Sequence, residues 1–245
     1  MMKLEVIAFN ISCCDKIERA GAHRIELCAN PQEGGTTPSA GFIDAARKKV
    51  SIELFPIIRP RGGDFLYSED EYEVIKADVI YCRDAGCDGI VTGMLNSDGL
   101  IDKEKISHIV KLAHPMEVTF HRAFDRTPDA FAALEDVIDA GCTRILTSGL
   151  QATAIEGSDL LLKLVEQAKG RIIIMPGSGI RSSNITDIAR LTGALEFHSS
   201  ARKLSADNMQ YHNVNLSDGK GHAVVDSGEV IKMMEALQLV TNGKE

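Results

Sequence analysis

Short apolar runs alternate with longer amphipathic segments along most of the chain, beginning with a predicted strand at residues 4–9. Four stretches repeat one pattern, in which a helix end is followed by a glycine that can cap it and then by an apolar strand. They begin at Ala20 (AGAHRIEL), Ala85 (AGCDGIVT), Ala140 (AGCTRILT) and Thr192 (TGALEFHS). Their starts lie 65, 55 and 52 residues apart, which leaves room for one more strand and two helices in each interval.

Candidate strands fill these intervals at residues 53–58, 117–121 and 171–175, which brings the predicted total to eight. Helices are predicted at 12–20, 42–48, 70–85, 103–113, 128–140, 157–168, 184–191 and 229–239. Strict alternation over this length predicts an α/β protein, a single (β/α)8 TIM-type barrel domain spanning 1–245, with an extended polar connection at 201–226 before the last helix. An open doubly wound sheet is the alternative, but no GxGxxG follows the first strand.

The segment EVTFHRAFD, from Glu117 to Asp125, carries the densest set of chemical groups at a predicted strand end. Glu117, Thr119 and His121 share one face of the strand, because successive side chains of a strand alternate. Charged groups near a core need a partner or a ligand. In a barrel the carboxyl ends of the strands form the site, so we predict functional roles for His121, Arg122 and Asp125.

Composition narrows the classes of function. Of 245 residues, 44% are hydrophobic and 25% charged, and 35 acidic against 27 basic residues give a formal net charge of -8. The surface as a whole is therefore expected to repel nucleic acid and anionic membranes. No apolar run has signal-peptide or membrane-span length, which predicts a soluble cytoplasmic protein. Six cysteines follow no CxxC or zinc-ribbon spacing and are expected to be reduced.

The other strand ends add further candidates. Alternation on the second strand points Glu26 and Cys28 inward, and a long loop at 30–41 follows as a candidate lid. After the third strand, RPRGGDF places Arg59, Arg61 and Asp64 in an anion-binding corner or in a solvated ion-paired turn, and the sequence favours neither.

The last two strand ends complete the predicted mouth. The seventh strand leads into MPGSGI, and glycine-rich backbone before a helix is a common anion site. On the eighth strand Glu196 and His198 share a face. His212 and His222, in the polar connection, are expected to be exposed. The predicted anion-binding residues are Gly177, Ser178, Gly179 and Ser199.

Together, the motifs IELCANPQEGGTTPS, IRPRGGDFLYS, VTFHRAFD, ILTSG, IMPGSGI and EFHSSAR resemble the CutC family of copper homeostasis proteins. The resemblance implies a TIM-like barrel, a cytoplasmic homo-oligomer (dimer or tetramer) and a role in copper handling. It implies a pocket built from Glu26, Cys28, Arg59, Arg61, Asp64, His121, Arg122, Asp125, Glu196 and His198. Ile7 stands where some members have a second inward cysteine.

Three functions are consistent with these residues. The resemblance favours a copper homeostasis protein that binds Cu(I) through Cys28, since Cu(I) prefers thiolate ligands. The residue chemistry favours an enzyme acting on a small phosphorylated or carboxylated molecule, with Glu26, His121 or His198 as general base and the arginines as a clamp. The third is a binding or scaffold module without catalysis.

Overall fold

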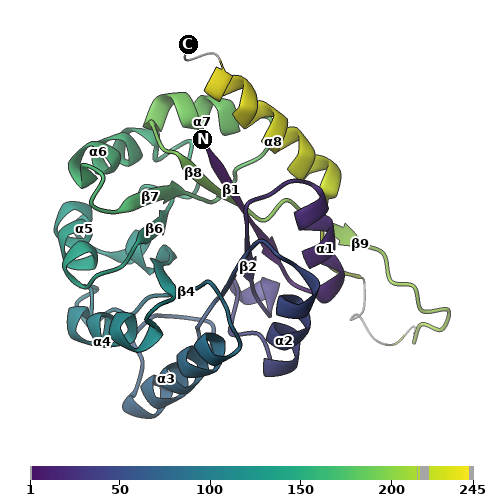
Figure 1. Ribbon diagram of the computed structural model, residues 1–245, viewed down its shortest axis with the longest axis horizontal. Helices are drawn as coiled ribbons and strands as arrows, with labels where there is room; N and C mark the ends of the chain where they lie inside the picture. Colours follow the sequence, from purple (N-terminus) through teal and green to yellow (C-terminus); the bar gives the residue numbers. More distant parts are fainter. Residues whose placement is uncertain (1, 214, 216–220, 243–245) are drawn as a thin grey trace.

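The computed structural model describes residues 2–213, 215 and 221–242, and it confirms the predicted barrel. Eight parallel strands form the ring seen in Figure 1, and each is followed by a helix on the outside. The strands are β1 (Lys3–Ala8), β2 (Arg24–Leu27), β3 (Glu53–Pro56), β4 (Gly89–Thr92), β5 (Glu117–Phe120), β6 (Arg144–Thr147), β7 (Ile173–Pro176) and β8 (Glu196–Ser199).

Hydrogen bonding divides the ring into two four-stranded sheets, ordered β3-β2-β1-β8 and β4-β5-β6-β7. A parallel bridge between Ile57 and Val91 joins β3 to β4, and β7 contacts β8 at the opposite seam. The register pairs Glu5 of β1 with Arg24 of β2 and with His198 of β8. The pairing therefore brings charged residues from distant parts of the sequence into one interior.

The helices lie close to the predicted positions. Capping explains several starts: Asp102 accepts a hydrogen bond from the Lys105 N–H, as a side chain at a helix start commonly does, and Ser68 and Glu71 form a capping box. Within the described residues, no helix has both the length and the apolar character required to cross a membrane. The helices are α1 (Ile11–Arg19), α2 (Ala40–Lys49), α3 (Glu69–Asp84), α4 (Lys103–Ala113), α5 (Ala130–Asp139), α6 (Ser158–Ala168), α7 (Ile185–Thr192) and α8 (Ser227–Asn242).

Phe55 on β3 occupies the middle of the barrel. A side chain at Gly89 would collide with its ring, since a Cβ there would lie 2.4 Å from Phe55 Cε2. The ring packs in a small cluster with Cys28, Ile57 and Val91, separate from the main core between strands and helices. The interior thus has an apolar middle layer with polar groups towards both ends.

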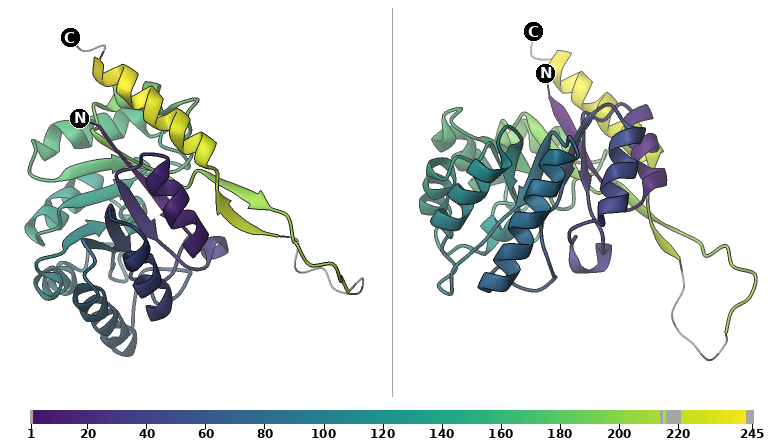
Figure 2. Two further views of the ribbon diagram at one scale, coloured as in Figure 1. Left: turned by 45° about the vertical axis from the view of Figure 1, so that its right-hand side comes forward. Right: turned by 60° about the horizontal axis from the view of Figure 1, so that its bottom comes forward.

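The polar connection at 201–226 contains structure that the sequence did not predict. Residues Arg202–Ser205 (β9) and His222–Val225 (β10) pair as an antiparallel hairpin that projects from the barrel (Figure 2). His212 and His222 are exposed, as predicted. Positions 214 and 216–220 of the predicted connection lie outside the described residues.

All six cysteines are free and buried.

Candidate functional site

A cavity of about 350 Å³ opens at the carboxyl ends of the strands. This is the end at which barrel enzymes hold their sites. Most of its lining comes from β2 and from the segments that follow β3, β5, β7 and β8. The polar lining residues are Glu26, Arg59, His121, Arg122, Ser178, Arg181, His198, Ser199, Ser200 and Arg202.

Three buried titratable residues form a chain at the base of this cavity. His198 Nδ1 lies 2.7 Å from Glu5 Oε1, and its Nε2 lies 3.7 Å from Glu26 Oε2. Glu5 is held from the other side, with its Oε2 3.0 Å from Arg24 Nε. Because Glu5 engages Nδ1, the Nε2 atom of His198 is left to exchange a proton with Glu26 or with a bound molecule.

The surroundings move the pKa values of these groups in different directions. Burial raises the pKa of Glu26 to about 7, although His198 partly opposes the shift. Burial also works against ionised Glu5, but Arg24 and then His198 outweigh it and lower its pKa. Burial disfavours protonated His198, yet the Glu5 hydrogen bond and the charge of Glu26 raise its pKa. Glu26 can therefore gain or lose a proton near neutral pH, as general acid and base catalysis requires.

Arginines surround the cavity mouth. Arg122 is engaged by Asp125, with 2.7 Å between Nε and Oδ2. Arg181 donates to the carbonyl of Arg202 at 3.2 Å, which ties the segment after β7 to the one after β8. Neither Arg181 nor Arg202 forms an ion pair with a carboxylate in the described part of the chain. Their charges are available to an anion.

The segment after β7 has a constrained backbone that faces the cavity. Ser178 has φ of 80°, a conformation that costs energy for any residue with a Cβ, and its hydroxyl donates to the Ala152 carbonyl at 2.7 Å. Among the described residues, the N–H groups of Gly179 and Ser200 donate to no protein acceptor. Unpaired backbone N–H groups suit a phosphate or carboxylate, and Gly179 in addition precedes helix α7.

Three of the four predicted anion-binding residues, Ser178, Gly179 and Ser199, line the cavity, but Gly177 does not. A Cβ at Gly177 would lie 2.4 Å from Leu146 Cδ1 and 3.4 Å from His198 Cβ. Gly177 therefore permits close packing beneath the cavity.

His121 is 4% exposed and lines the cavity as predicted. Burial, and then the nearby charge of Arg59, lowers the pKa of its imidazole to about 3. The ring lies 4.8 Å from that of Phe65, between centroids. His121 is thus a neutral group at neutral pH.

Asp125 does not line the cavity but organises the segment beside it. Its carboxylate accepts hydrogen bonds from the Thr147 hydroxyl at 2.5 Å and from the Ser148 and Leu150 N–H groups at 3.0 and 3.2 Å. It also holds Arg122, whose Nη2 donates to Ser148 Oγ at 2.9 Å. Asp125 therefore positions Arg122.

The arginines of the RPRGGDF segment have two different roles: Arg59 lines the cavity and Arg61 forms surface ion pairs. Arg59 lines the cavity and donates to the carbonyls of Glu33, Gly35 and Gly63, which binds the loops after β2 and β3 together. Arg61 and Asp64 do not line it. Arg61 pairs with Asp64 at 3.0 Å and with Glu71 at 2.6 Å. Arg61 and Asp64 therefore form a solvated, ion-paired turn, which is one of the two arrangements expected from the sequence.

Cys28 lies beside the cavity rather than in its lining, packed in the cluster around Phe55. Burial and the neighbouring charge of Glu26 raise the pKa of its thiol well above the usual value, so the group is protonated. The described part of the chain brings three potential metal ligands together only at Glu5, Glu26 and His198. That set lacks sulfur and does not fit Cu(I), which prefers thiolate and thioether ligands.

The structure places Glu196 at the opposite end of the barrel from the predicted mouth. It is the first residue of β8, and its Oε2 accepts from Arg24 Nη1 at 2.8 Å and Arg144 Nε at 2.7 Å. Glu196 and His198 do share a strand face, as predicted, but two residues along a strand separate them in depth. The amino end of a barrel commonly serves stability.

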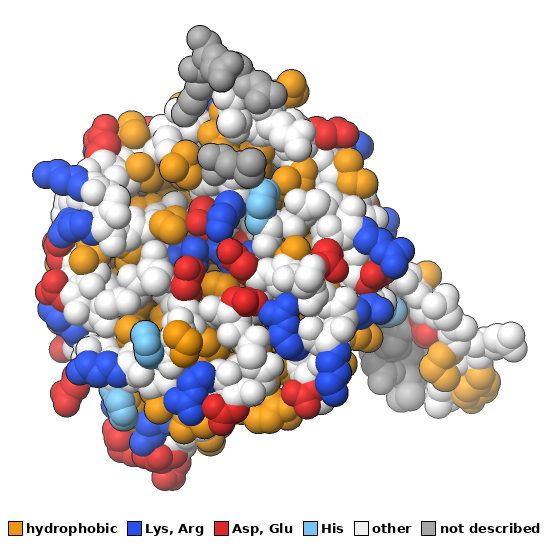
Figure 3. Space-filling view, viewed as in Figure 1, with side chains coloured by type: hydrophobic (Ala, Val, Ile, Leu, Met, Phe, Trp, Pro, Cys, Tyr) orange, Lys and Arg blue, Asp and Glu red, His pale blue; other side chains and the backbone are white. Residues whose placement is uncertain are grey.

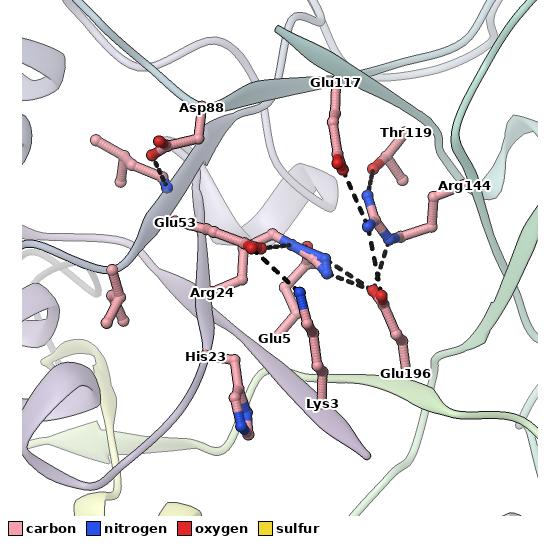
Figure 4. Close-up of polar contacts among 12 residues, drawn as sticks. Lys3, Glu5, His23, Arg24, Glu53, Asp88, Glu117, Thr119, Arg144 and Glu196 are labelled. Atoms are coloured by element: carbon pink, nitrogen blue, oxygen red, sulfur yellow. Dashed lines mark hydrogen bonds and ion pairs between the residues drawn. The ribbon is translucent and has the colours of Figure 1, made fainter. Parts of the chain in front are cut away.

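This amino-end network spans six strands, because Arg24 also pairs with Glu53 of β3, and charged groups gather near the middle of the face shown in Figure 3. Arg144 also reaches Glu117 at 3.1 Å and the Thr119 hydroxyl at 3.2 Å (Figure 4). The guanidinium carbons of Arg24 and Arg144 lie 4.8 and 5.6 Å from the Phe55 ring centroid. Arg24 and Arg144 thus each have carboxylate partners and an aromatic neighbour.

Sequence reasoning missed four contributors to the site and its support: Glu5, Arg24, Arg181 and Arg202. Glu5 had a detectable signal, because alternation along β1 puts it on the inward face with Ile7. Arg181 and Arg202 carried none, since Arg181 lies in an irregular segment and Arg202 begins β9, a strand that the sequence did not predict.

Comparison with known proteins gives a consistent result. The model of the CutC family matches residues 2–203. The chain belongs to the CutC family. A CutC family protein of Chromobacterium violaceum is 48% identical over 91% of this chain and 90% of its own length. The human protein named copper homeostasis protein cutC homolog is 47% identical over 88% of this chain and 79% of its own.

Solved structures agree. CutC from Streptococcus agalactiae has a TM-score of 0.78 and 34% identity, covering 82% of this chain and 99% of that one. Thiamine phosphate pyrophosphorylase from Pyrococcus furiosus, at 14% identity and a TM-score of 0.61, shares the fold alone.

Proposed function

We propose that this CutC-family protein binds a small phosphorylated or carboxylated molecule in the mouth cavity and transfers a proton to or from it through Glu26. The observation that carries the proposal is the placement of a buried Glu26–His198–Glu5 chain at the base of a cavity whose rim holds Arg181 and Arg202, which form no ion pair within the described residues. An inert network would pair its charges internally, as the amino-end network does.

Each part of the cavity has a role in this proposal. Arg181, Arg202 and the N–H groups of Gly179 and Ser200 hold the anionic group. Glu26 is the proton-transfer group. Glu5 fixes the orientation of the His198 ring through Nδ1. The Nε2 atom of His198 therefore stays beside the Glu26 carboxyl group, whether that group is protonated or ionised. The volume of about 350 Å³ suits a small metabolite.

Removing both rim arginines is expected to weaken anion binding. In the double variant Arg181→Ala with Arg202→Ala, the dissociation constant of glycerol 3-phosphate should rise at least about tenfold, because charge-assisted hydrogen bonds are lost. Isothermal titration calorimetry measures it. The control is Lys163→Ala with Arg190→Ala, which removes the same charge from exposed helix positions. Equal binding by both variants would contradict the proposal, as would a wild type that binds no small anion.

Cu(I) binding is the second candidate, supported by the names of the human and mouse relatives. The protonated, enclosed Cys28 and the absence of sulfur from the one ligand cluster in the described residues favour the first proposal over it. In a competition titration with a Cu(I) chelator, we expect wild type and Cys28→Ser to behave alike. Tight binding that Cys28→Ser abolishes would establish copper binding instead.

A further inference from the structure

Two buried hydrogen-bond donors that line the cavity have no partner in the described structure: His121 Nε2 and Arg59 Nε. Buried polar groups are nearly always paired, and leaving one unpaired is destabilising. Both side chains pack on the same ring, with Phe65 lying 4.8 Å from the His121 ring and 5.0 Å from the Arg59 guanidinium carbon. Both donors therefore belong to side chains that contact one aromatic ring of the cavity lining, and Arg59 is close enough to lower the pKa of His121.

The tautomer of His121 follows from its other nitrogen. The Ala123 N–H donates to Nδ1 at 3.2 Å, so Nδ1 carries a lone pair and the proton of the neutral ring is on Nε2. A Cβ at Gly93 would lie 2.5 Å from Nδ1, which shows that the Nδ1 edge is pressed against the barrel wall. Nε2–H lies on the far side of Cε1 from this contact, on a side chain that lines the cavity.

We propose that His121 Nε2–H, with Arg59 Nε–H beside it, donates to a carbonyl oxygen of the same small molecule whose anionic group Arg181 and Arg202 hold. The inference rests on the proposed function and specifies its substrate class: a phosphorylated or carboxylated compound with a C–H bond next to a ketone or aldehyde. A neutral imidazole suits this oxygen, because it polarises the carbonyl without giving up its proton.

The reaction is an enolisation. The Glu26 carboxylate accepts the proton from the carbon next to the carbonyl, and the C–H bond breaks. Its electron pair forms a carbon–carbon double bond, and the carbonyl oxygen becomes an enolate oxygen stabilised by His121 and Arg59. Return of a proton from Glu26 to the same carbon regenerates the carbonyl compound, and exchange of the Glu26 proton with water before that return replaces the original hydrogen. No oxidant or reductant is consumed.

The test compares two probes by isothermal titration calorimetry: phosphoglycolohydroxamate, which imitates the enediolate, and glycerol 3-phosphate, which has no carbonyl. Wild type should bind the first at least about 100-fold more tightly, within the range by which transition-state analogues exceed substrates. His121→Phe should lose at least about tenfold of this preference, since one donor to the oxyanion is removed, with glycerol 3-phosphate affinity unchanged. His121→Gln, whose amide N–H can reach the same position, should retain most of it.

The outcomes separate the two proposals. Equal binding of both probes by wild type, or an unchanged preference in His121→Phe, overturns this inference and leaves anion binding standing. Failure of wild type to bind either probe overturns both. The melting temperature of His121→Phe shows whether the variant is folded, because the variant loses the Nδ1 acceptor of the Ala123 N–H together with the unpaired Nε2 donor.

Discussion

Arg144→Ala should lower the free energy of unfolding by about 3–5 kcal/mol, the range for removing one partner of a buried ion pair. Arg144 is 2% exposed, and it pairs with Glu196 at 2.7 Å at the amino end of the barrel. The substitution leaves a carboxylate with less compensation and opens space beside Phe55. Urea denaturation followed by circular dichroism measures the change.

Arg171→Ala is the matched control, because Arg171 pairs with Glu135 at 2.7 Å on the surface, where both side chains are more than 40% exposed. Exposed pairs contribute little, so we expect a loss below about 1 kcal/mol. Equal losses in the two variants would show that the amino-end network does not stabilise the barrel as we infer.

Glu26→Gln should reduce proton exchange between a carbonyl substrate and water by about 10²–10⁴-fold, because the variant retains the shape of the side chain but cannot take a proton. Dihydroxyacetone phosphate in D₂O is a suitable probe, with exchange of its α-hydrogens followed by NMR. Glu166→Gln, on the exposed face of α6, is the control and should exchange as wild type does. A Glu26→Gln variant with the wild-type exchange rate would remove Glu26 from the mechanism.

The stability of the same variant should fall less with rising pH than that of wild type. The folded-state pKa of Glu26, about 7, is above its usual 4.5, so ionisation costs more in the folded than in the unfolded protein. Wild type therefore loses stability from this group as the pH rises from about 4.5 to just above 7, with about 1 kcal/mol of the loss between pH 6 and 8. Glu26→Gln lacks that loss, so the stability difference between the two proteins should grow with pH. Parallel curves would contradict the burial argument.

The repeat at Ala20, Ala85, Ala140 and Thr192 was sufficient to predict the barrel, because each glycine cap and apolar strand is a local signal. Strand alternation also placed Glu26, His121 and His198 correctly on the inward face. Whether these residues are catalytic stays a prediction.

Depth in the barrel could not be predicted. Alternation defines which face a side chain occupies, but not how far along the barrel axis it lies, and Glu196 was assigned to the wrong end for that reason. The roles of Arg61 and Asp64 could not be predicted either. The two residues can pair with each other or line a site, and their spacing in the sequence is compatible with both.

Side-chain contacts between strands that are distant in the sequence could not be predicted either. Glu5 meets His198 across 193 residues of sequence, through the closure of β1 on β8. Nothing local to either residue indicates this contact.

The Glu5 carboxylate connects the amino-end network with the charged groups at the base of the cavity. Its Oε2 is held by Arg24 of the amino-end network, and its Oε1 by His198 at the base of the cavity. A change in charge in the amino-end network therefore alters the charge on Glu5 and, through it, the pKa of the His198 imidazole. The amino-end network and the cavity are therefore electrostatically coupled through Glu5. Substitutions made in the amino-end network to change stability would also shift the pKa values of His198 and Glu26.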